Sequence, residues 1–533
     1  MKEKFESYSR SPMTNRVERT ISGRPNRPSV HKIHVPKKGR IRVILLLVIF
    51  AVACKFLFHK DMQHKAAVKS ALMKEKSDEK SHLQNNTIAA DTSKQADGHF
   101  SDRDEEGFVP PVLQKGHSQK ASNLPKENTG FFGGLKLFAK PEIPKQGFAV
   151  SDLTALLKKH PPKPGAIRDS IDSNNAKYVI HYSIDTCVQR TAETLMRQYH
   201  PKYGALIALN SKTGRVLASV SYTREGESQL GDNLFVKSIF PAASVFKTVT
   251  AAAAIEKGGL TTESQLQLTG RKYTLYKFQL KQDLEVSQPV SLEQAYAFSM
   301  NPVFARIGLY VVGAAGIKEY MGKFGFNSPI PCEVENDINH ADISVSDSQM
   351  TIAEIASGFN RKTRMSPLFG AMIAASVCEN GKMPLPTFVD SITCGDSSTI
   401  FKCEPHTWRT PMKPTTASSL KSMMSRVAHL GTARTAFRYI HHSQFFDEID
   451  YGGKTGTVDE DVLGKIDWFV GFAENPTDPR QHIAVGVVTV HDQYWTVHSS
   501  FVAAEIFRKY IRQAQMAQKA EKKEQTAGTK PIG

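Results

Sequence analysis

Three short segments of the chain carry side chains that together could transfer an acyl group. They supply a hydroxyl with an amine three residues later, a second hydroxyl beside an amide, and a lysine before a glycine and two threonines: Ser244-Val245-Phe246-Lys247, Ser299-Met300-Asn301 and Lys454-Thr455-Gly456-Thr457. A serine that passes its proton to a neighbouring amine can attack a carbonyl and form a covalent ester. The pattern therefore predicts nucleophilic catalysis by Ser244 with Lys247 as its base.

Copies of these patterns occur elsewhere, and their surroundings distinguish them. Ser77 and Lys80 lie in a charged run with no apolar face that would hold their geometry. Ser418 and Lys421 have no partner motifs at a suitable distance. Lys212-Thr213-Gly214 separates two strand-like runs, as the tip of a hairpin does. The set that begins at Ser244 is therefore the predicted site.

A buried helix is expected to hold the first motif. Apolar residues continue from Ser244 as far as Ile255, and Lys257-Gly258-Gly259 is a typical helix end. Ser244 would then lie at the N-terminus of this helix, with Lys247 on the same face. The hydroxyl and the amine could meet through local structure alone.

The second motif is expected between two short helices. Ser291 followed by Gln294 predicts a capping box that opens the first helix, and Ser299 follows its end. Asn301-Pro302 predicts the N-cap and first position of the second helix, Val303–Val311. Capping alone would also explain Asn301, so its chemical role depends on the other two motifs.

The third motif is expected on a β-hairpin. Tyr451–Val458 and Asp467–Ala473 read as its two strands, with a polar turn between them. A glycine inside a strand, such as Gly456, often marks a place where another backbone comes close. A peptide laid along this strand would need that room.

The remaining elements predict an α/β (α+β) domain. A strand at Tyr178–Tyr182, a helix at Thr186–Tyr199 and a hairpin over 204–221 precede the first motif. A largely helical stretch runs to about residue 440, and a strand His482–Val490 and a helix from about Ser499 end the domain. Strands at both ends of a helical insert imply one antiparallel sheet flanked by helices with an inserted helical subdomain.

In these motifs the chain resembles the transpeptidase domain of penicillin-binding proteins, the serine acyltransferases that cross-link bacterial peptidoglycan. The motif separations of 55 and 155 residues resemble those of the high-molecular-weight members. Further stretches resemble the family at matching places: Gly214-Arg215-Val216-Leu217-Ala218, Lys323-Phe324-Gly325-Phe326, Gln349-Met350-Thr351-Ile352-Ala353 and Gly431-Thr432-Ala433. The likeness covers residues 165 to 515 and implies a similar fold, with the site in the cleft between sheet and helical subdomain.

The resemblance implies a D-Ala-D-Ala transpeptidase that passes through an acyl-enzyme. Lys247 would take the proton of Ser244 as a neutral amine, and its pKa would be lowered by burial and by the cation of Lys454. Ser244 would attack the carbonyl of the penultimate D-Ala of a peptidoglycan stem peptide. Ser299 would relay the proton to the leaving D-Ala. β-Lactam antibiotics would be inhibitors, and no cofactor is expected.

The same resemblance implies how the substrate binds. Thr455 and Thr457, on either side of Gly456, would hydrogen-bond the substrate carboxylate, and Lys454 would hold the Ser299 hydroxyl. The backbone N–H groups of Ser244 and Thr457 would form the oxyanion hole. Asn301 would hold either the substrate amide or Lys247.

A basic arm and an apolar run open the chain. Residues 1–42 hold twelve Lys or Arg against three Glu, which is an excess of nine in a formal net charge of +17. Residues 43–58 would span about 24 Å as a helix, against roughly 30 Å of hydrocarbon. This order predicts a single-pass signal anchor with its N-terminus inside. Cleavage after Ala53 or lipid attachment at Cys54 are alternatives. The anchor accounts for the basic charge, so nucleic-acid binding is not expected.

The domain plan follows from these segments. Residues 59–145 read as a solvated linker, 146–515 as the transpeptidase domain and 516–533 as a polar tail. We expect the domain outside the bacterial cytoplasmic membrane, in the periplasm where one exists. No glycosyltransferase signature is recognised, so a separate glycosyltransferase is the expected partner.

Cysteines and metal motifs suggest little more. Of the six cysteines, Cys394 and Cys403 flank a polar, turn-rich segment and could form a disulfide. No C-x-x-C or H-E-x-x-H motif occurs, so no metal site is expected.

Three other activities use related machinery. A D,D-carboxypeptidase differs only in using water as the acceptor. A β-lactamase would need fast deacylation, and the extra glutamate pattern of the class A enzymes is not found. A membrane-anchored β-lactam sensor would need an output domain that the 42-residue arm does not offer.

Overall fold

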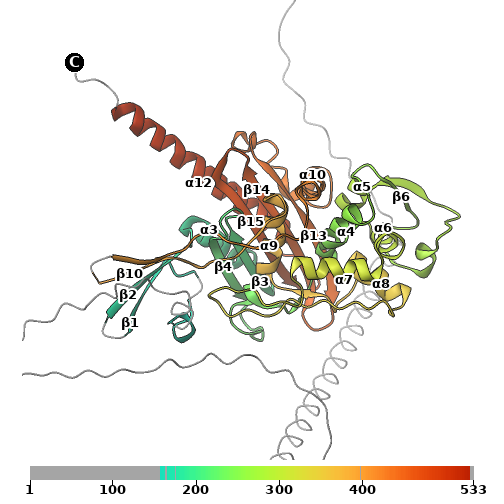
Figure 1. Cartoon of the computed structure of the whole chain (residues 1–533), viewed down its shortest axis with the longest axis horizontal. Helices are drawn as coiled ribbons and strands as arrows, with labels where there is room; N and C mark the ends of the chain where they lie inside the picture. Colours follow the sequence, from blue (N-terminus) through green and yellow to red (C-terminus); the bar gives the residue numbers. More distant parts are fainter. Residues whose placement is uncertain (1–155, 163–164, 174–175, 396–397, 529–533) are drawn as a thin grey trace, which may run out of the picture. The chain divides into compact units, whose positions relative to one another are not determined.

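A computed structural model describes residues 156–528, except 163–164, 174–175 and 396–397. Its centre is a five-stranded antiparallel sheet in the order β13-β14-β15-β3-β4 (Figure 1). The strands are β13 Asp450–Glu460, β14 Gly464–Asn475, β15 Asp478–His491, β3 Tyr203–Leu209 and β4 Val216–Thr223. Early and late parts of the chain meet where β15 pairs with β3, as the sequence predicted.

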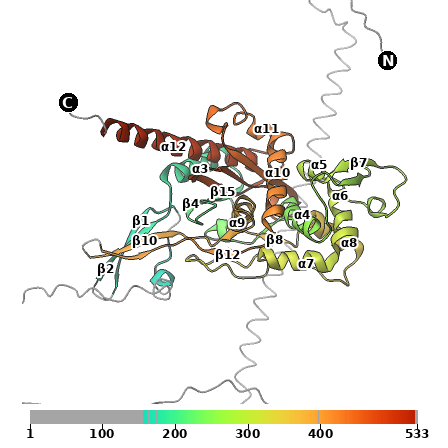
Figure 2. The same cartoon turned by 45° about the horizontal axis from the view of Figure 1, so that its top comes forward.

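Helices cover both faces of this sheet, which is why β14 and β15 are buried along nearly their whole length. The strands read as near-continuous apolar runs for the same reason. Figure 2 shows one helix pair on either side: α3 Thr186–Tyr199 with α12 Ser499–Gly528, and α9 Pro367–Cys378 with α10 Pro414–His429. The predicted bounds of α3 are confirmed, and Asp185 caps its N-terminus.

The helical subdomain lies between β4 and α9 and forms the green and yellow end of Figure 1. Its helices are α4 Lys247–Glu256, α5 Leu292–Ala297, α6 Asn301–Ile307, α7 Gly313–Phe324 and α8 Gln349–Ser357. A π-helical turn at Gly308–Val312 separates α6 from α7. Two small antiparallel pairs complete its connections: β5 Phe240–Pro241 with β8 Arg364–Met365, and β6 Gln265–Leu268 with β7 Gln288–Ser291. The short helix α11 Arg434–Phe437 lies outside the subdomain, after α10, and packs against α10 and α12.

A second antiparallel sheet, in the order β1-β2-β10-β11, has a small apolar cluster of its own. Its strands are β1 Arg168–Ser173, β2 Ala176–Tyr182, β10 Val389–Cys394 and β11 Ser398–Lys402, and the pair β9 Met383–Pro384 with β12 Thr407–Arg409 lies nearby in sequence. Its strand at Tyr178–Tyr182 was predicted, but as part of the central sheet. The expectation of a single sheet is therefore wrong, because, within the residues that the structure describes, β2 pairs with β1 and β10 and with no strand of the central sheet.

The possible disulfide between Cys394 and Cys403 does not form, because both cysteines are free thiols. Cys394 pairs with Ser398 at the closed end of the β10–β11 hairpin. The Cys403 N–H donates to the Asp390 carbonyl at the other end. The two thiols therefore lie at opposite ends of one hairpin, although they flank the same turn in sequence.

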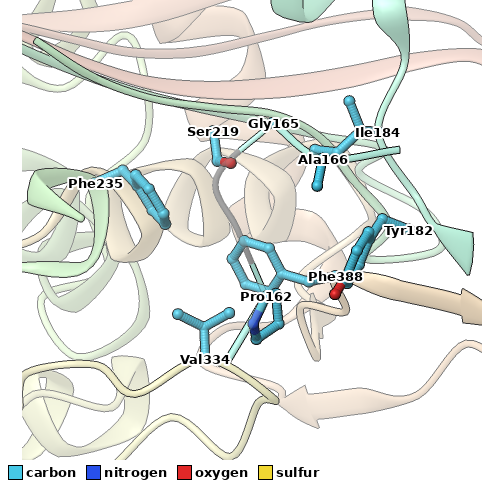
Figure 3. A pocket seen from close by; sticks show the side chains of 9 residues that line it. All are labelled: Pro162, Gly165, Ala166, Tyr182, Ile184, Ser219, Phe235, Val334 and Phe388. Atoms are coloured by element: carbon cyan, nitrogen blue, oxygen red, sulfur yellow. The ribbon is translucent and has the colours of Figure 1, made fainter. Parts of the chain in front are cut away.

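A small pocket lies between the end of β2 in the second sheet and β4 in the central sheet (Figure 3). Tyr182, Ser219 and Phe388 are among its lining residues, and no residue of the three motifs is. Its space of about 10 Å³ accepts nothing larger than a single water molecule. The pocket is a packing feature and not a substrate site.

The N-terminal predictions fall outside the described residues. These include the arm 1–42, the membrane segment 43–58 and the linker 59–145. Within the described part of the chain, no helix is at once long enough and apolar enough to cross a bilayer.

Candidate active site

Ser244 lies in a 3-10 turn, Ala243–Phe246, that leads directly into α4. Lys247 is the first residue of α4 and is fully buried. Its Nζ lies 2.8 Å from Ser244 Oγ. The predicted local pairing of hydroxyl and amine is therefore present, although Ser244 precedes the α-helix instead of opening it.

Two further partners orient the Lys247 amine. Its Nζ lies 2.7 Å from Asn301 Oδ1 and also contacts the Ser357 carbonyl oxygen. Both oxygens can only accept, so they take the two N–H bonds of a neutral amine. The remaining lone pair then faces the Ser244 hydroxyl, which is the arrangement that a general base requires.

Electrostatics favour that neutral state. Burial, and secondly the nearby Lys454 ammonium, lower the pKa of Lys247 well below its ordinary value. Burial alone lowers the pKa of Lys454 to about 7. Within this pair we take Lys247 as the first to lose its proton, because it feels both effects.

Lys454 holds the second hydroxyl. Its Nζ donates to Ser299 Oγ at 3.0 Å and to the Thr455 carbonyl at 2.8 Å. Ser299 therefore accepts from a cation and keeps its own proton free to donate. The structure thus brings the amine of β13 to the loop between α5 and α6, which lies 155 residues earlier.

Asn301 does not cap a helix through its side chain, and that prediction is wrong. Met300 occupies the N-cap position of α6, and Asn301 is the first helical residue. Its Nδ2 donates to the Tyr273 carbonyl at 3.0 Å, which turns Oδ1 toward Lys247. Tertiary contacts prevail over the local capping preference here. Of the two roles expected for Asn301, the geometry favours holding Lys247. The capping box of Ser291 and Gln294 is confirmed.

Backbone strain is found beside both hydroxyls. Ala243 has φ +48° and Ser299 has φ +56°, in the left-handed region that side chains rarely adopt. Such residues cost on the order of 1–3 kcal/mol each and persist only where the surroundings hold them. Here one of them directly precedes Ser244 and the other is Ser299 itself.

The threonines of the third motif lie on β13, which is an edge strand of the sheet. Thr457 is exposed, and its Oγ1 lies 3.5 Å from Asp467 Oδ1 on β14. A Cβ on Gly456 would come within 3.2 Å of the Ala243 Cβ and 3.3 Å of a Val245 methyl. The glycine therefore lets β13 approach the turn that carries Ser244.

An open cleft joins these groups. It has a volume of about 1030 Å³, and its lining includes Ser244, Ser299, Asn301, Thr455 and Thr457. Lys247 and Lys454 reach these hydroxyls from the buried side. All three motifs therefore meet at one site.

A sequence profile described as "Penicillin binding protein transpeptidase domain" matches residues 204–512, more than half of the chain. The chain belongs to the penicillin-binding protein transpeptidase family. The family match includes all three motifs and the strands and helices that hold them.

Curated relatives in this family are distant. The chain is 25% identical to "Peptidoglycan D,D-transpeptidase PbpA" of Mycobacterium tuberculosis over 369 residues, which is 62% of this chain and 71% of that protein. It is 24% identical to the protein of that name in Mycolicibacterium smegmatis, over 54% of this chain and 62% of the relative's length. "Stage V sporulation protein D" of Bacillus subtilis is 23% identical, over 68% of this chain and 57% of its own length.

Solved structures share the fold. The crystal structure of PBPA from Mycobacterium tuberculosis matches 63% of this chain and 81% of its own, with a TM-score of 0.50 at 21% identity. Penicillin-binding protein 3 from Mycobacterium tuberculosis, complexed with aztreonam, matches 63% and 80%, with a TM-score of 0.52 at 18% identity.

Three residues of this family member's cleft were missed from the sequence. The Ser357 carbonyl holds Lys247, and a Cβ on Gly358 would lie 2.0 Å from the Ala243 carbonyl oxygen. Thr432 Oγ1 lies 2.5 Å from Thr455 Oγ1. The resemblance of Gly431-Thr432-Ala433 to the family is the sequence signal that points to Thr432.

Proposed function

We propose that this family member is a peptidoglycan D,D-transpeptidase that works through an ester on Ser244. The observation that carries the proposal is the paired contact of Lys247 with Ser244 at 2.8 Å and of Lys454 with Ser299 at 3.0 Å. The names of the mycobacterial relatives support the reaction and its substrate.

Acylation begins with Lys247 as a neutral amine. Its lone pair takes the Ser244 proton while Ser244 Oγ forms a bond to the carbonyl carbon of the penultimate D-Ala. The carbonyl electron pair moves to oxygen and gives a tetrahedral oxyanion, which nearby backbone N–H groups stabilise. Asn301 Oδ1 and the Ser357 carbonyl accept hydrogen bonds from the ammonium that results.

The leaving group then needs a proton. Ser299 donates its hydroxyl proton to the nitrogen of the terminal D-Ala. It regains a proton from the Lys247 ammonium that formed in the first step, through the amines of the site. The C–N bond breaks, the carbonyl reforms and an ester remains on Ser244. The hydrogen bond from Lys454 stabilises the Ser299 oxygen while Ser299 lacks its hydroxyl proton.

Deacylation reverses these movements. The amine of a second stem peptide attacks the ester carbonyl, and its proton leaves through the same hydroxyl and amine groups. The C–O bond to Ser244 breaks and Oγ regains its proton, so a new peptide bond joins two stems. Water in place of the amine would give the D,D-carboxypeptidase reaction.

The substrate is proposed to lie along β13. An edge strand offers free backbone groups to an extended peptide. Thr455 and Thr457 then lie beside the terminal carboxylate, and Gly456 keeps β13 close to the Ser244 turn. β-Lactams would occupy the same place and leave a stable ester.

The cellular setting belongs to the same proposal. Residues 43–58 would anchor the chain once in the cytoplasmic membrane, with the catalytic domain outside. The chain would cross-link strands that a separate glycosyltransferase has polymerised. The excess of nine positive charges in residues 1–42 supports this orientation.

The decisive experiment is covalent labelling with a fluorescent penicillin. We expect Ser244→Ala to abolish the label and mass mapping of the wild-type adduct to place it on Ser244. Ser418→Ala is the matched control, since Ser418 is exposed on α10 and also precedes a lysine by three residues. Labelling that persists in Ser244→Ala would refute the assignment.

Product analysis then separates the acyl acceptors. A stem peptide ending in D-Ala-D-Ala is incubated with and without an amine acceptor, and the products are identified by mass spectrometry. Cross-linked peptide that depends on the acceptor supports a transpeptidase, whereas trimmed peptide alone supports a carboxypeptidase. Rapid turnover of the penicillin would instead indicate a β-lactamase.

A further inference from the structure

Four side chains with metal-binding atoms meet at the sheet end where α9 finishes and β14 turns into β15. They are Cys378, Glu379, Glu474 and His482, and one donor atom of each lies within 4.8 Å of the other three. Cys378 is the last residue of α9 and Glu379 its C-cap, whereas Glu474 and His482 lie on the two strands. None of the four lines the Ser244 cleft.

The donor atoms converge on a common point. Cys378 Sγ lies 2.6 Å from Glu474 Oε2 and 3.7 Å from Glu379 Oε1. His482 Nδ1 lies 2.9 Å from Glu379 Oε1 and 3.6 Å from Glu474 Oε2. Cys378 and Glu474 are each 3% exposed and His482 is 7% exposed, so water screens these groups little.

The histidine is oriented as a ligand. Its Nε2 lies 3.0 Å from the Asn475 carbonyl oxygen, which can only accept, so Nε2 carries a proton. In the neutral ring, Nδ1 then directs a lone pair toward two carboxylate oxygens, which repel it. A cation between these three atoms would turn the repulsion into attraction. A backbone carbonyl behind the histidine is typical of metal-binding sites.

The other ligands also have outer partners. The Lys421 ammonium contacts the second oxygen of Glu474, and Ser211 Oγ donates to Glu379 Oε1 at 2.7 Å. The C-terminal end of α9 adds the negative end of its dipole, which favours a cation. Without a metal, the Cys378 thiol donates to Glu474 and burial raises the pKa of this thiol. With a metal bound, the Cys378 thiolate and the two carboxylates would carry three negative charges, which a divalent ion and Lys421 together balance.

We propose that Cys378, Glu379, Glu474 and His482 bind one divalent ion of the zinc class. A set of one sulfur, one nitrogen and two carboxylate oxygens suits tetrahedral Zn²⁺ with all four positions filled by protein. Such a closed site is structural: it would fasten the end of α9 to the β14–β15 turn and take no part in acyl transfer. The proposal is independent of the proposed function.

This inference departs from the sequence-based expectation of no metal site. That expectation depended on short spacings such as C-x-x-C, which mark ligands from one local segment. Here the ligands come from the end of a helix and from two strands almost a hundred residues further on, 96 in the case of Cys378 and Glu474. Only the folded chain brings them together.

Cobalt substitution tests the site directly. The purified full chain is treated with a chelator and titrated with Co²⁺, whose thiolate complexes absorb in the near ultraviolet and whose tetrahedral complexes have intense visible bands. We expect one Co²⁺ per chain with both sets of bands, displaced by one equivalent of Zn²⁺. As isolated, the untreated chain should hold about one zinc by elemental analysis.

Variants identify the ligands. Cys378→Ser should remove the thiolate band, whereas Cys403→Ser, a half-buried thiol outside the cluster, should keep it. Ser211→Ala should weaken Zn²⁺ binding about 10- to 100-fold, as loss of an outer partner does. Penicillin labelling reports whether each variant is folded.

Two results would overturn the proposal. One is wild-type protein that labels with penicillin but shows no thiolate band at millimolar Co²⁺, which would make the cluster a hydrogen-bonded network without a metal. The other is a thiolate band that survives in folded Cys378→Ser. The wild-type titration decides the first point even where the variants fail to fold.

Discussion

Replacement of Gly358 by alanine should slow acylation without touching any reactive group. Gly358 has φ +66°, and an added Cβ would lie 2.0 Å from the Ala243 carbonyl oxygen and 3.2 Å from the Ser244 Cα. Since real Cβ contacts are essentially never shorter than 3.0 Å, the two segments must separate by about 1 Å. The preceding carbonyl, of Ser357, holds Lys247, so the same shift disturbs the base.

The magnitude follows from two contributions. A left-handed residue with a side chain costs roughly 1–2 kcal/mol, which lowers stability. A displacement of about 1 Å at reacting groups costs on the order of 100-fold in rate. We therefore expect the second-order rate constant for acylation by a fluorescent penicillin to fall about 100-fold.

Gly259→Ala is the matched control. Gly259 has φ +64°, nearly the same as Gly358, but nothing lies within 4 Å of its added Cβ. In urea unfolding it should lose only the roughly 1–2 kcal/mol of the left-handed conformation, and it should keep wild-type acylation. The reasoning fails if Gly358→Ala acylates within about threefold of Gly259→Ala, because the crowding against Ala243 would then have no catalytic effect.

Three further predictions concern the amines and one anchoring contact. The rate of acylation should follow a bell-shaped pH profile. It should fall on the acid side as Lys247 takes up a proton, and on the alkaline side as the pH passes the pKa of Lys454, about 7. Stopped-flow acylation measures both limbs, and Lys454→Arg should remove the alkaline limb from the activity that remains. Asn301→Asp places a carboxylate about 2.7 Å from the Lys247 amine and should raise its pKa by roughly 1–3 units, so an acid limb that stays in place would contradict a neutral base. Trp468→Phe removes the N–H that donates to the buried Pro241 carbonyl at 2.8 Å and should cost about 1–3 kcal/mol of unfolding free energy in urea, whereas a loss under about 0.5 kcal/mol would show that this link is dispensable.

The sequence was sufficient wherever the determining signal is local. The spacing of Ser244 and Lys247 predicted their contact, because two residues that are three positions apart in a helical turn lie on the same face. Ser291 and Gln294 predicted a capping box, and the apolar pattern of Thr186–Tyr199 predicted α3. The β13–β14 hairpin followed from two strand-like runs around a polar turn.

Long-range contacts decided the remainder. The Ser357 carbonyl holds Lys247 from 110 residues away, and a backbone carbonyl has no sequence signature. Asn301 in front of Pro302 has the local pattern of a helix cap, but its side-chain amide donates a hydrogen bond to the Tyr273 carbonyl instead. The strands β10 and β11 are short and largely polar, so no clear alternation marked them as a sheet.

The wide spread of the motifs along the chain affects when the protein becomes reactive. Trp468 and Pro241, which join β14 to the segment before Ser244, are 227 positions apart, and such distant pairings are entropically costly to form early in folding. A partly synthesised or incompletely folded chain therefore displays Ser244 without the partners that activate it. Covalent capture by a penicillin would count finished molecules only, and its stoichiometry gives the native fraction of a preparation.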